Sequence, residues 1–391
     1  MNLYLIDLTF FGFYPFDGNF GFSKVLDAKS ITHQFSNDEI NEFRSIIANP
    51  NNKIVLHALT EAWTPAAINS VLELLEVAHG ASNAVLLLDT MIRQGYPKEL
   101  NTIRFDNILF YDYFLAMTAE YEDSYGSNDV INLTTNKFLY MMGKPFRPNR
   151  IELLYDLYQR DRLVNCDWSF HYDERLAKKT RERLPNLTDV EYDEFVSKTQ
   201  RSLDPINVMM AEGFSHYHGY PVDHSLYAKT SFSLISETPD WWPRFLTEKT
   251  WRTIANRHAF VTTSYHTAID ALENLGIDTF QYMLNHSKNV IPKDHAELTT
   301  LTIDNTIHFL ENIDAQQEQI KLSINNNYAA YRAAVAKERS IVCVELEGLL
   351  KPRRYEKQSP IIKVQNADEV WCPLTESNRR PTAYWAVATT N

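Results

Sequence analysis

A short stretch in the second half of the chain combines the residue types that bind a phosphate. A predicted strand ends at Glu237, a loop rich in proline and tryptophan follows, and Thr247 precedes a predicted helix. Glu248 and Lys249 fall in the first turn of that helix. Such a turn has free backbone N–H groups and the positive end of the helix dipole. Because a lysine there adds a full charge and a glutamate can accept hydrogen bonds from ribose hydroxyls, the pattern predicts a sugar-nucleotide site.

The same residues have a simpler interpretation. Thr247, Glu248 and Lys249 also read as a plain helix start, in which threonine caps the helix and a carboxylate is favourable in the first turn. Short motifs often match by chance, so the choice between the two interpretations depends on the rest of the chain.

A second pair of cations stands at another predicted helix start. Arg147 and Arg150 follow a predicted strand, and Arg150 lies at the beginning of the next helix. A cation there cannot compensate the helix dipole, because it is at the wrong end. We therefore favour Arg150 as a second phosphate contact. The alternative is a solvated pair whose stems pack on the sheet edge, and for Arg147 the two interpretations are balanced.

The elements that carry these residues alternate between strands and helices. In the first third, we predict strands over 3–8, 53–58 and 84–89, and helices over 37–48 and 66–79. Residues 108–111 read as a fourth strand, with a helix that runs through Phe114 as the alternative. Further along, we predict strands over 137–142, 166–171, 231–236 and 259–263, and helices over 149–159, 189–198, 248–257, 292–310 and 325–337. This alternation predicts an α/β fold with parallel sheets in two Rossmann-like domains.

A polar, turn-rich stretch over residues 120–135 marks the predicted domain boundary. We expect a domain over 1–135 that faces the acceptor and a domain over 136–340 that binds the nucleotide sugar. Residues 341–391 form a predicted C-terminal extension, with the last twenty or so residues disordered.

Composition narrows the class of protein. The chain has 391 residues, more than the roughly 250–300 over which a single core grows, so two domains are expected. A net charge of −12 leans against binding a nucleic-acid backbone as the main task. Three distant cysteines form no zinc pattern, and no apolar run is long enough to span a bilayer. We therefore expect a soluble, cytoplasmic protein with no membrane partner.

Several sequence runs in the second half of the chain form a recognisable combination: Phe232-x-Leu-x-x-Glu237, Thr247-Glu-Lys-x-Trp251, the predicted strand Ala259-Phe-Val-Thr-Thr, the run Phe146-Arg-Pro-Asn-Arg150 and the lead-in Tyr227-Ala-Lys-Thr-Ser-Phe232. Together they closely resemble the nucleotide-binding segment of α1,3-fucosyltransferases. They also resemble glycosyltransferase-like proteins of phages and large viruses, which would place the chain in a host cytoplasm. The resemblance covers roughly residues 136–285.

The resemblance implies a GT-B fold, in which two Rossmann-like domains face each other across a cleft, and a reaction without a metal. It implies that Lys249 contacts the donor diphosphate, that Glu248 contacts the ribose, and that Arg150 is a second cation on the phosphates. Glu237 would shape the donor pocket. Thr238 replaces the asparagine that follows this glutamate in the family, so neither the contact of that asparagine nor the identity of the sugar carries over.

The catalytic base should come from the first domain, just past the end of a strand. Glu61 fits this position, Asp89 is the second choice, and both also read as ordinary strand-end or helix-entry carboxylates. His57 lies inside its strand and is expected to be buried. No Asp-x-Asp motif is present, and His216 and His218 alone supply too few ligands for a metal.

These observations favour an inverting hexosyl- or pentosyltransferase that uses a nucleotide sugar and needs no other cofactor. The acceptor would be a glycan, or a hydroxymethylated base in phage DNA, where the basic stretches 175–183 and 351–357 could follow the backbone. The alternative is an inactive nucleotide- or glycan-binding module of the same fold. A dehydrogenase-like enzyme is not supported, since no G-x-G-x-x-G run follows a strand.

Overall fold

The chain forms two compact units. A computed structural model describes residues 2–7, 37–58, 65–78, 81, 83–89, 98–106, 108–142, 145, 147, 149–170, 177–200, 224–237, 246–263, 266–350, 356–357 and 361–364. One unit is Met1–Ala116 with Ala336–Asn391, and the other is Met117–Val335. Helices α5 (Tyr113–Tyr125) and α14 (Gln317–Leu350) contribute residues to both units. The sequence places the boundary later, within 120–135.

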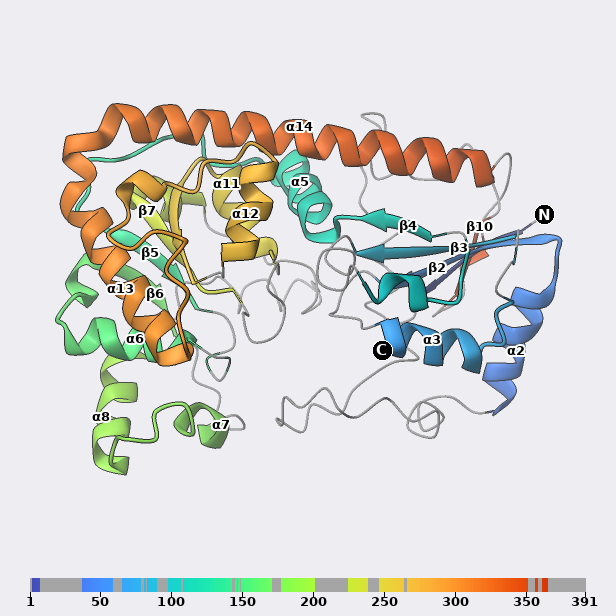
Figure 1. Cartoon of the computed structure of the whole chain (residues 1–391), viewed down its shortest axis with the longest axis horizontal. Coiled ribbons are helices and arrows are strands. Elements are labelled where there is room, and N and C mark those ends of the chain that lie inside the picture. Colours follow the sequence, from blue (N-terminus) through green and yellow to red (C-terminus); the bar gives the residue numbers. More distant parts are fainter. Residues whose placement is uncertain are drawn as a thin grey trace. The chain divides into compact units, whose positions relative to one another are not determined.

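The first unit is built on a six-stranded sheet of order β4-β3-β2-β1-β10-β9. Strands β1 to β4 are parallel, whereas β10 pairs antiparallel with β1 and with β9 (Figure 1). The elements are β1 (Asn2–Asp7), α2 (Asn37–Ala48), β2 (Asn52–Ala58), α3 (Pro65–Leu74), β3 (Ala84–Asp89), η2 (Leu100–Thr102), β4 (Ile108–Tyr111), β9 (Glu356–Lys357) and β10 (Ile361–Val364).

Hydrophobic patterning explains these elements. The apolar run Ala84–Leu88 in β3 is buried without interruption, as expected for a parallel strand that is covered on both faces. In α2, Ile40, Phe43 and Ile47 recur at helical spacing and are all buried.

Two features of this unit differ from the sequence-based prediction. Helix α3 ends at Leu74 rather than at residue 79, because Glu76 adopts φ 53° and the N–H of Val77 bonds back to the carbonyl of Leu72. This is a Schellman ending, which glycine usually makes, so Gly80 was the wrong stop signal. Strand β10 pairs with β1, so residues 361–364 belong to the first sheet rather than to a separate extension.

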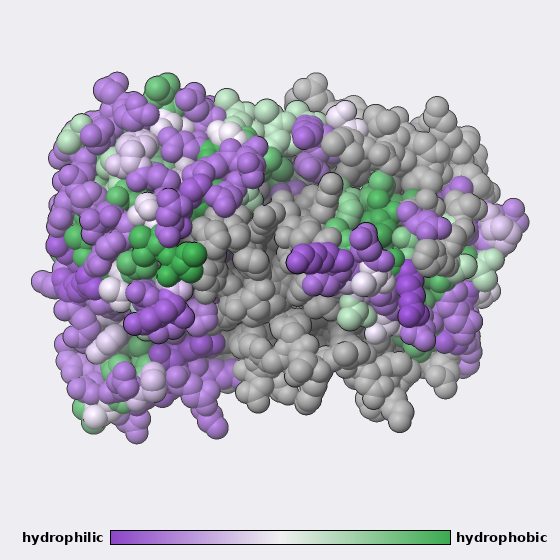
Figure 2. All heavy atoms as spheres, in the orientation of Figure 1, coloured by the Kyte–Doolittle hydropathy of each residue, from purple (hydrophilic) through white to green (hydrophobic). Residues whose placement is uncertain are grey.

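The second unit contains a four-stranded sheet of order β6-β5-β7-β8, in which all neighbouring strands are parallel. On the face that Figure 2 shows, the described residues of this unit are mainly hydrophilic. Its elements are β5 (Phe138–Met141), α6 (Arg150–Gln159), η3 (Leu163–Asn165), β6 (Cys166–Ser169), α7 (Ala177–Arg181), α8 (Asp189–Thr199), α10 (His224–Lys229), β7 (Phe232–Ile235), α11 (Glu248–Ala255), β8 (Ala259–Thr262), α12 (His266–Asn274), η5 (Gln281–Met283), α13 (His295–Asn312) and η6 (Ile313–Gln316).

Aromatic side chains fill the core of this unit. Phe138 of β5 and Phe232 of β7 stack with ring centroids 5.3 Å apart, and Phe309 of α13 lies 4.5 Å from Phe232. Trp251 of α11 is fully buried, and its ring centroid lies 6.4 Å from that of Tyr331 in α14. The predicted α/β class is therefore confirmed: both sheets consist mainly of parallel strands with helices, which is compatible with a Rossmann-like fold.

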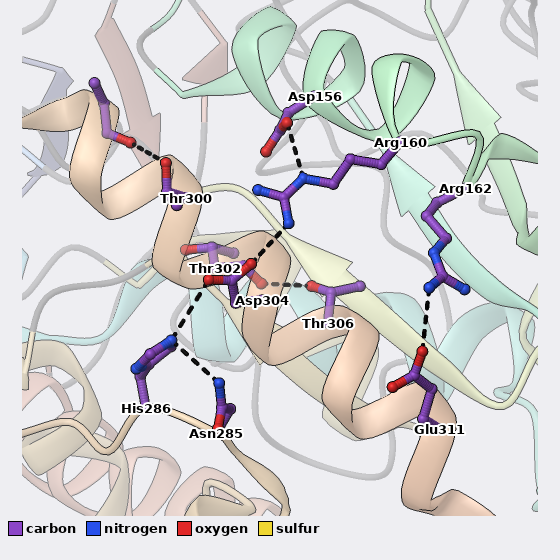
Figure 3. Close-up of polar contacts among 11 residues, drawn as sticks. Asp156, Arg160, Arg162, Asn285, His286, Thr300, Thr302, Asp304, Thr306 and Glu311 are labelled. Carbon is purple, nitrogen blue, oxygen red and sulfur yellow. Dashed lines mark hydrogen bonds and ion pairs between the residues drawn. The ribbon is translucent and has the colours of Figure 1, made fainter.

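Charged side chains fasten α13 to α6, the helix that Arg150 begins. Arg160 bonds to Asp156 within α6 at 3.1 Å and to Asp304 of α13 at 2.7 Å (Figure 3). His286 lies 3.5 Å from the other carboxylate oxygen of Asp304, between Nε2 and Oδ2. These pairs are half-exposed, so they orient the helices more than they stabilise the fold.

His258, at the start of β8, is a buried polar group with two partners. Its Nδ1 lies 2.8 Å from the hydroxyl of Ser233, and its Nε2 lies 2.8 Å from the carbonyl of Thr230. Nε2 must donate to the carbonyl, and in the neutral ring Nδ1 then accepts from the hydroxyl of Ser233. Burial lowers the pKa of His258 to about 4, although the bond to Thr230 opposes the shift.

We predict that His258 makes the stability of the protein depend on pH. Its pKa is lower in the folded than in the unfolded chain, so its contribution is complete above pH 6.5 and is lost as pH falls towards 4. The loss should reach about 3 kcal/mol. Urea unfolding between pH 4 and 7 should show a smaller pH dependence for His258→Gln than for wild type. The matched variant His286→Gln, at a half-exposed histidine, should keep the wild-type slope; equal slopes in all three proteins would contradict the assignment.

Candidate functional site

The candidate residues of the second unit lie in the two segments that follow β5 and β7, where the strand order of the sheet reverses. From β5 the chain passes through α6 to β6 on one side, whereas from β7 it passes through α11 to β8 on the other. Right-handed crossovers then place α6 and α11 on opposite faces of the sheet. Since β5 and β7 are neighbours, a crevice is expected beyond their carboxyl ends, where open α/β sheets bind ligands.

Glu237 lies two residues beyond the end of β7 and is almost completely buried, with 1% of its surface exposed. Its Oε1 accepts from the backbone N–H of Thr247 at 2.9 Å and from the hydroxyl of Thr250 at 2.7 Å. Its Oε2 accepts from the hydroxyl of Thr247 at 2.6 Å. The carboxylate therefore holds the first turn of α11 against the end of β7. The sequence assigns Glu237 to the wall of a donor pocket, but in the structure its oxygens are already used by the helix start.

Lys249 occupies the outer side of the same turn. Its ammonium group lies 2.9 Å from Oε1 of Glu248 and 3.2 Å from the hydroxyl of Thr247. About a fifth of the Lys249 side chain and a quarter of the Glu248 side chain are exposed. The site thus presents a paired cation and anion that a ligand can reach.

Glu248 stays ionised through its neighbours. Burial opposes its negative charge, but Lys249 and Arg252 outweigh that effect and lower the pKa of Glu248 to about 2. An ionised carboxylate is the acceptor that two ribose hydroxyls would need.

Two backbone N–H groups of this helix start already have acceptors, so fewer of them are available to a ligand than the sequence predicts. The N–H of Thr247 donates to Glu237, and that of Lys249 donates to the hydroxyl of Thr247 at 3.3 Å. A phosphate would therefore be held here mainly by the ammonium group of Lys249.

Arg150 opens α6 and is 4% exposed. The preceding Asn149 adopts φ 63° and gives no side-chain cap, while Tyr140 of β5 donates its hydroxyl proton to the carbonyl of Arg150 at 2.8 Å. Burial raises the pKa of Tyr140, and the charge of Arg150 opposes that rise. Arg147 is half-buried in the segment between β5 and α6. Both arginines thus belong to the first of the two segments that border the reversal point.

Several other predicted residues lie outside the described part of the chain: Glu61, His216, His218, Thr238, Arg175 and residues 351–355. Asp89 ends β3 and His57 lies in β2, as predicted for their backbones. Two residues of the candidate site were not predicted from the sequence: Thr250, which donates to Glu237, and Arg252, which lowers the pKa of Glu248. Thr250 follows Thr247 by three residues, a spacing that places both on one helix face, and this could have identified it.

Comparisons with known proteins add no relative. No protein-family model matches the chain, and no curated protein matches it.

Within the described residues, no group of three or more His, Cys, Asp or Glu side chains could hold a metal ion. None of the described helices combines the length and apolar character that crossing a membrane requires.

We predict that Glu237→Ala strongly destabilises the second unit. The change removes three hydrogen bonds and leaves the N–H of Thr247 buried without its acceptor, at a loss of about 3 kcal/mol or more. Urea unfolding followed by circular dichroism measures this loss. Glu297→Ala is the matched control, because Glu297 accepts one backbone N–H at the half-exposed start of α13 and should cost about 1 kcal/mol or less. Similar losses in the two variants would contradict the role of Glu237.

Proposed function

We propose that this chain is a glycosyltransferase of GT-B type that binds a nucleotide sugar at the carboxyl end of β5 and β7. The observation that carries the proposal is the position of the cations. Lys249 and Arg150 stand at the starts of the two helices that follow these neighbouring strands. Such a reversal point is where α/β sheets bind nucleotides. The likeness of the sequence motifs to α1,3-fucosyltransferases and viral glycosyltransferase-like proteins supports the same site.

The proposed division of labour follows from the charges. Lys249 exchanges its contact with Glu248 for an oxygen of the donor diphosphate, and Glu248 becomes free to accept hydrogen bonds from the ribose. Arg150 supplies a second positive charge on the phosphates. These cations stabilise the negative charge that the diphosphate gains as it leaves.

The proposed reaction is an inverting displacement. The acceptor hydroxyl oxygen attacks the anomeric carbon of the sugar, the bond from that carbon to the diphosphate oxygen breaks, and its electron pair stays on the leaving diphosphate. The hydroxyl proton passes to a carboxylate of the first unit, for which we propose Glu61. Loss of that base would leave donor binding without turnover, which is the behaviour of the alternative, an inactive binding module.

We predict that one of the GDP-, UDP-, CMP- or dTDP-sugars raises the melting temperature of the full chain. A ligand at 100 times its dissociation constant adds about 2.7 kcal/mol to the stability of the state that it binds. Lys249→Ala should abolish most of this stabilisation, because the diphosphate loses its cation. Lys321→Ala is the control, since Lys321 is a half-exposed lysine paired with Glu318 on α14. Full stabilisation of Lys249→Ala by the best donor would refute the phosphate site.

The acceptor is tested with the donor found in that experiment. We favour a glycan over DNA, because the net charge of −12 opposes a polyanionic substrate. Transfer to a free oligosaccharide should change little when salt rises from about 50 to 200 mM, whereas binding that depends on several DNA phosphates falls steeply over this range. Transfer that requires hydroxymethylated DNA and falls steeply with salt would instead identify a DNA-modifying enzyme.

Glu61→Gln should lose turnover with either acceptor but should still be stabilised by the donor.

A further inference from the structure

The hydroxyl of Thr247 lies between a buried anion and the candidate phosphate-binding cation. Lys249 donates to its oxygen twice, from the backbone N–H at 3.3 Å and from the ammonium group at 3.2 Å. A hydroxyl has two acceptor lone pairs and one proton. Because both lone pairs are engaged by Lys249, the proton must point to Oε2 of Glu237, which lies 2.6 Å away.

The direction of these bonds depends on Glu237 being a carboxylate. All three of its partners donate: the backbone N–H of Thr247 and the hydroxyls of Thr247 and Thr250. An ionised acceptor at 2.6 Å makes a charge-assisted bond, which is short and strong. The buried charge of Glu237 therefore fixes the orientation of the Thr247 hydroxyl, and that hydroxyl keeps its lone pairs directed at Lys249.

We propose that Glu237 and Thr247 are positioning residues that hold the ammonium group of Lys249 where a ligand phosphate is received. The ammonium group of Lys249 donates to the hydroxyl of Thr247, which in turn donates to the carboxylate of Glu237. The ammonium group also donates to the carboxylate of Glu248. A lysine side chain has four rotatable bonds, so fixing its end reduces the entropy lost when a phosphate binds. The role in ligand binding rests on the proposed function, whereas the effect on Lys249 itself does not.

Thr250 provides the matched comparison. It is as buried as Thr247, stands in the same helix turn and donates to the same carboxylate at 2.7 Å. Within the described part of the chain, the hydroxyl of Thr250 hydrogen-bonds Glu237 and not Lys249. Replacing either threonine by valine therefore removes a buried hydrogen bond to Glu237, but only Thr247→Val also removes the contacts with the ammonium group and the backbone N–H of Lys249.

The test measures Lys249 directly and then its ligand. Lys249 acylation by an amine-reactive reagent is followed by mass spectrometry, and pyrophosphate and GDP affinities are measured by calorimetry on the full chain. We expect Thr247→Val to speed acylation several-fold and to weaken pyrophosphate binding about tenfold, which corresponds to about 1.4 kcal/mol. Thr250→Val keeps the helix cap, so it should lose less stability than Thr247→Val and stay within about twofold of wild type in both measurements.

Two further variants keep the test decisive if Thr247→Val folds poorly. Thr247→Ser retains the hydroxyl and should restore wild-type acylation and affinity. Glu237→Gln keeps the shape but presents an amide, whose N–H competes with Lys249 for the Thr247 oxygen, so it should resemble Thr247→Val. Equal acylation rates in Thr247→Val and Thr250→Val, or no rescue by serine, would overturn the positioning role. If acylation follows the expected pattern but wild type binds neither pyrophosphate nor GDP, the positioning role stands and the proposed function fails.

Discussion

A single buried carboxylate organises the second unit around its candidate site. Glu237 is a charge taken out of water, and it is tolerated because three donors of one helix turn surround it. This contact ties the end of β7 to the start of α11, and β7 lies at the centre of the sheet beside β5. The position of Lys249 follows from it. Breaking the contact would disturb the candidate site and the strand–helix junction together, so under the proposed function ligand binding and folding depend on one interaction.

The alternation of strands and helices was readable because both signals are local. The strands over 84–89 and 108–111 and the helix over 37–48 have the predicted bounds, since uninterrupted apolar runs and a helical apolar period report burial directly. Long-range pairing was not readable. Strand β10 joins β1 from more than three hundred residues away, and its short run carries no sign of its partner. Helix α14 extends far beyond the predicted 325–337 because its ends lack strong stop signals, and α12 was missed altogether.

For the candidate site, residue types were predictable but bonding was not. Phosphate chemistry and helix-start rules identified Thr247, Glu248, Lys249 and Arg150 from the sequence. The sequence did not show that Glu237 and Glu248 have different roles, because those roles depend on how deeply each side chain is buried. Glu237 is enclosed and acts as an internal anion for the helix start, whereas Glu248 remains partly exposed beside Lys249 and Arg252. The two glutamates are eleven residues apart, and this spacing does not indicate which of them is buried.

The pairing of Lys249 with Glu248 has a consequence for selectivity. A lysine without a partner attracts every anion in the cell, including inorganic phosphate and polyphosphates. Here an incoming anion gains Lys249 only by leaving Glu248 with Arg252 as its remaining positive neighbour. A ligand with hydroxyl groups next to its phosphate can bind Lys249 through the phosphate and Glu248 through the hydroxyls. A simple anion can bind only Lys249. If the proposed function holds, the ion pair therefore selects against abundant simple anions and favours ligands that carry hydroxyl groups beside a phosphate.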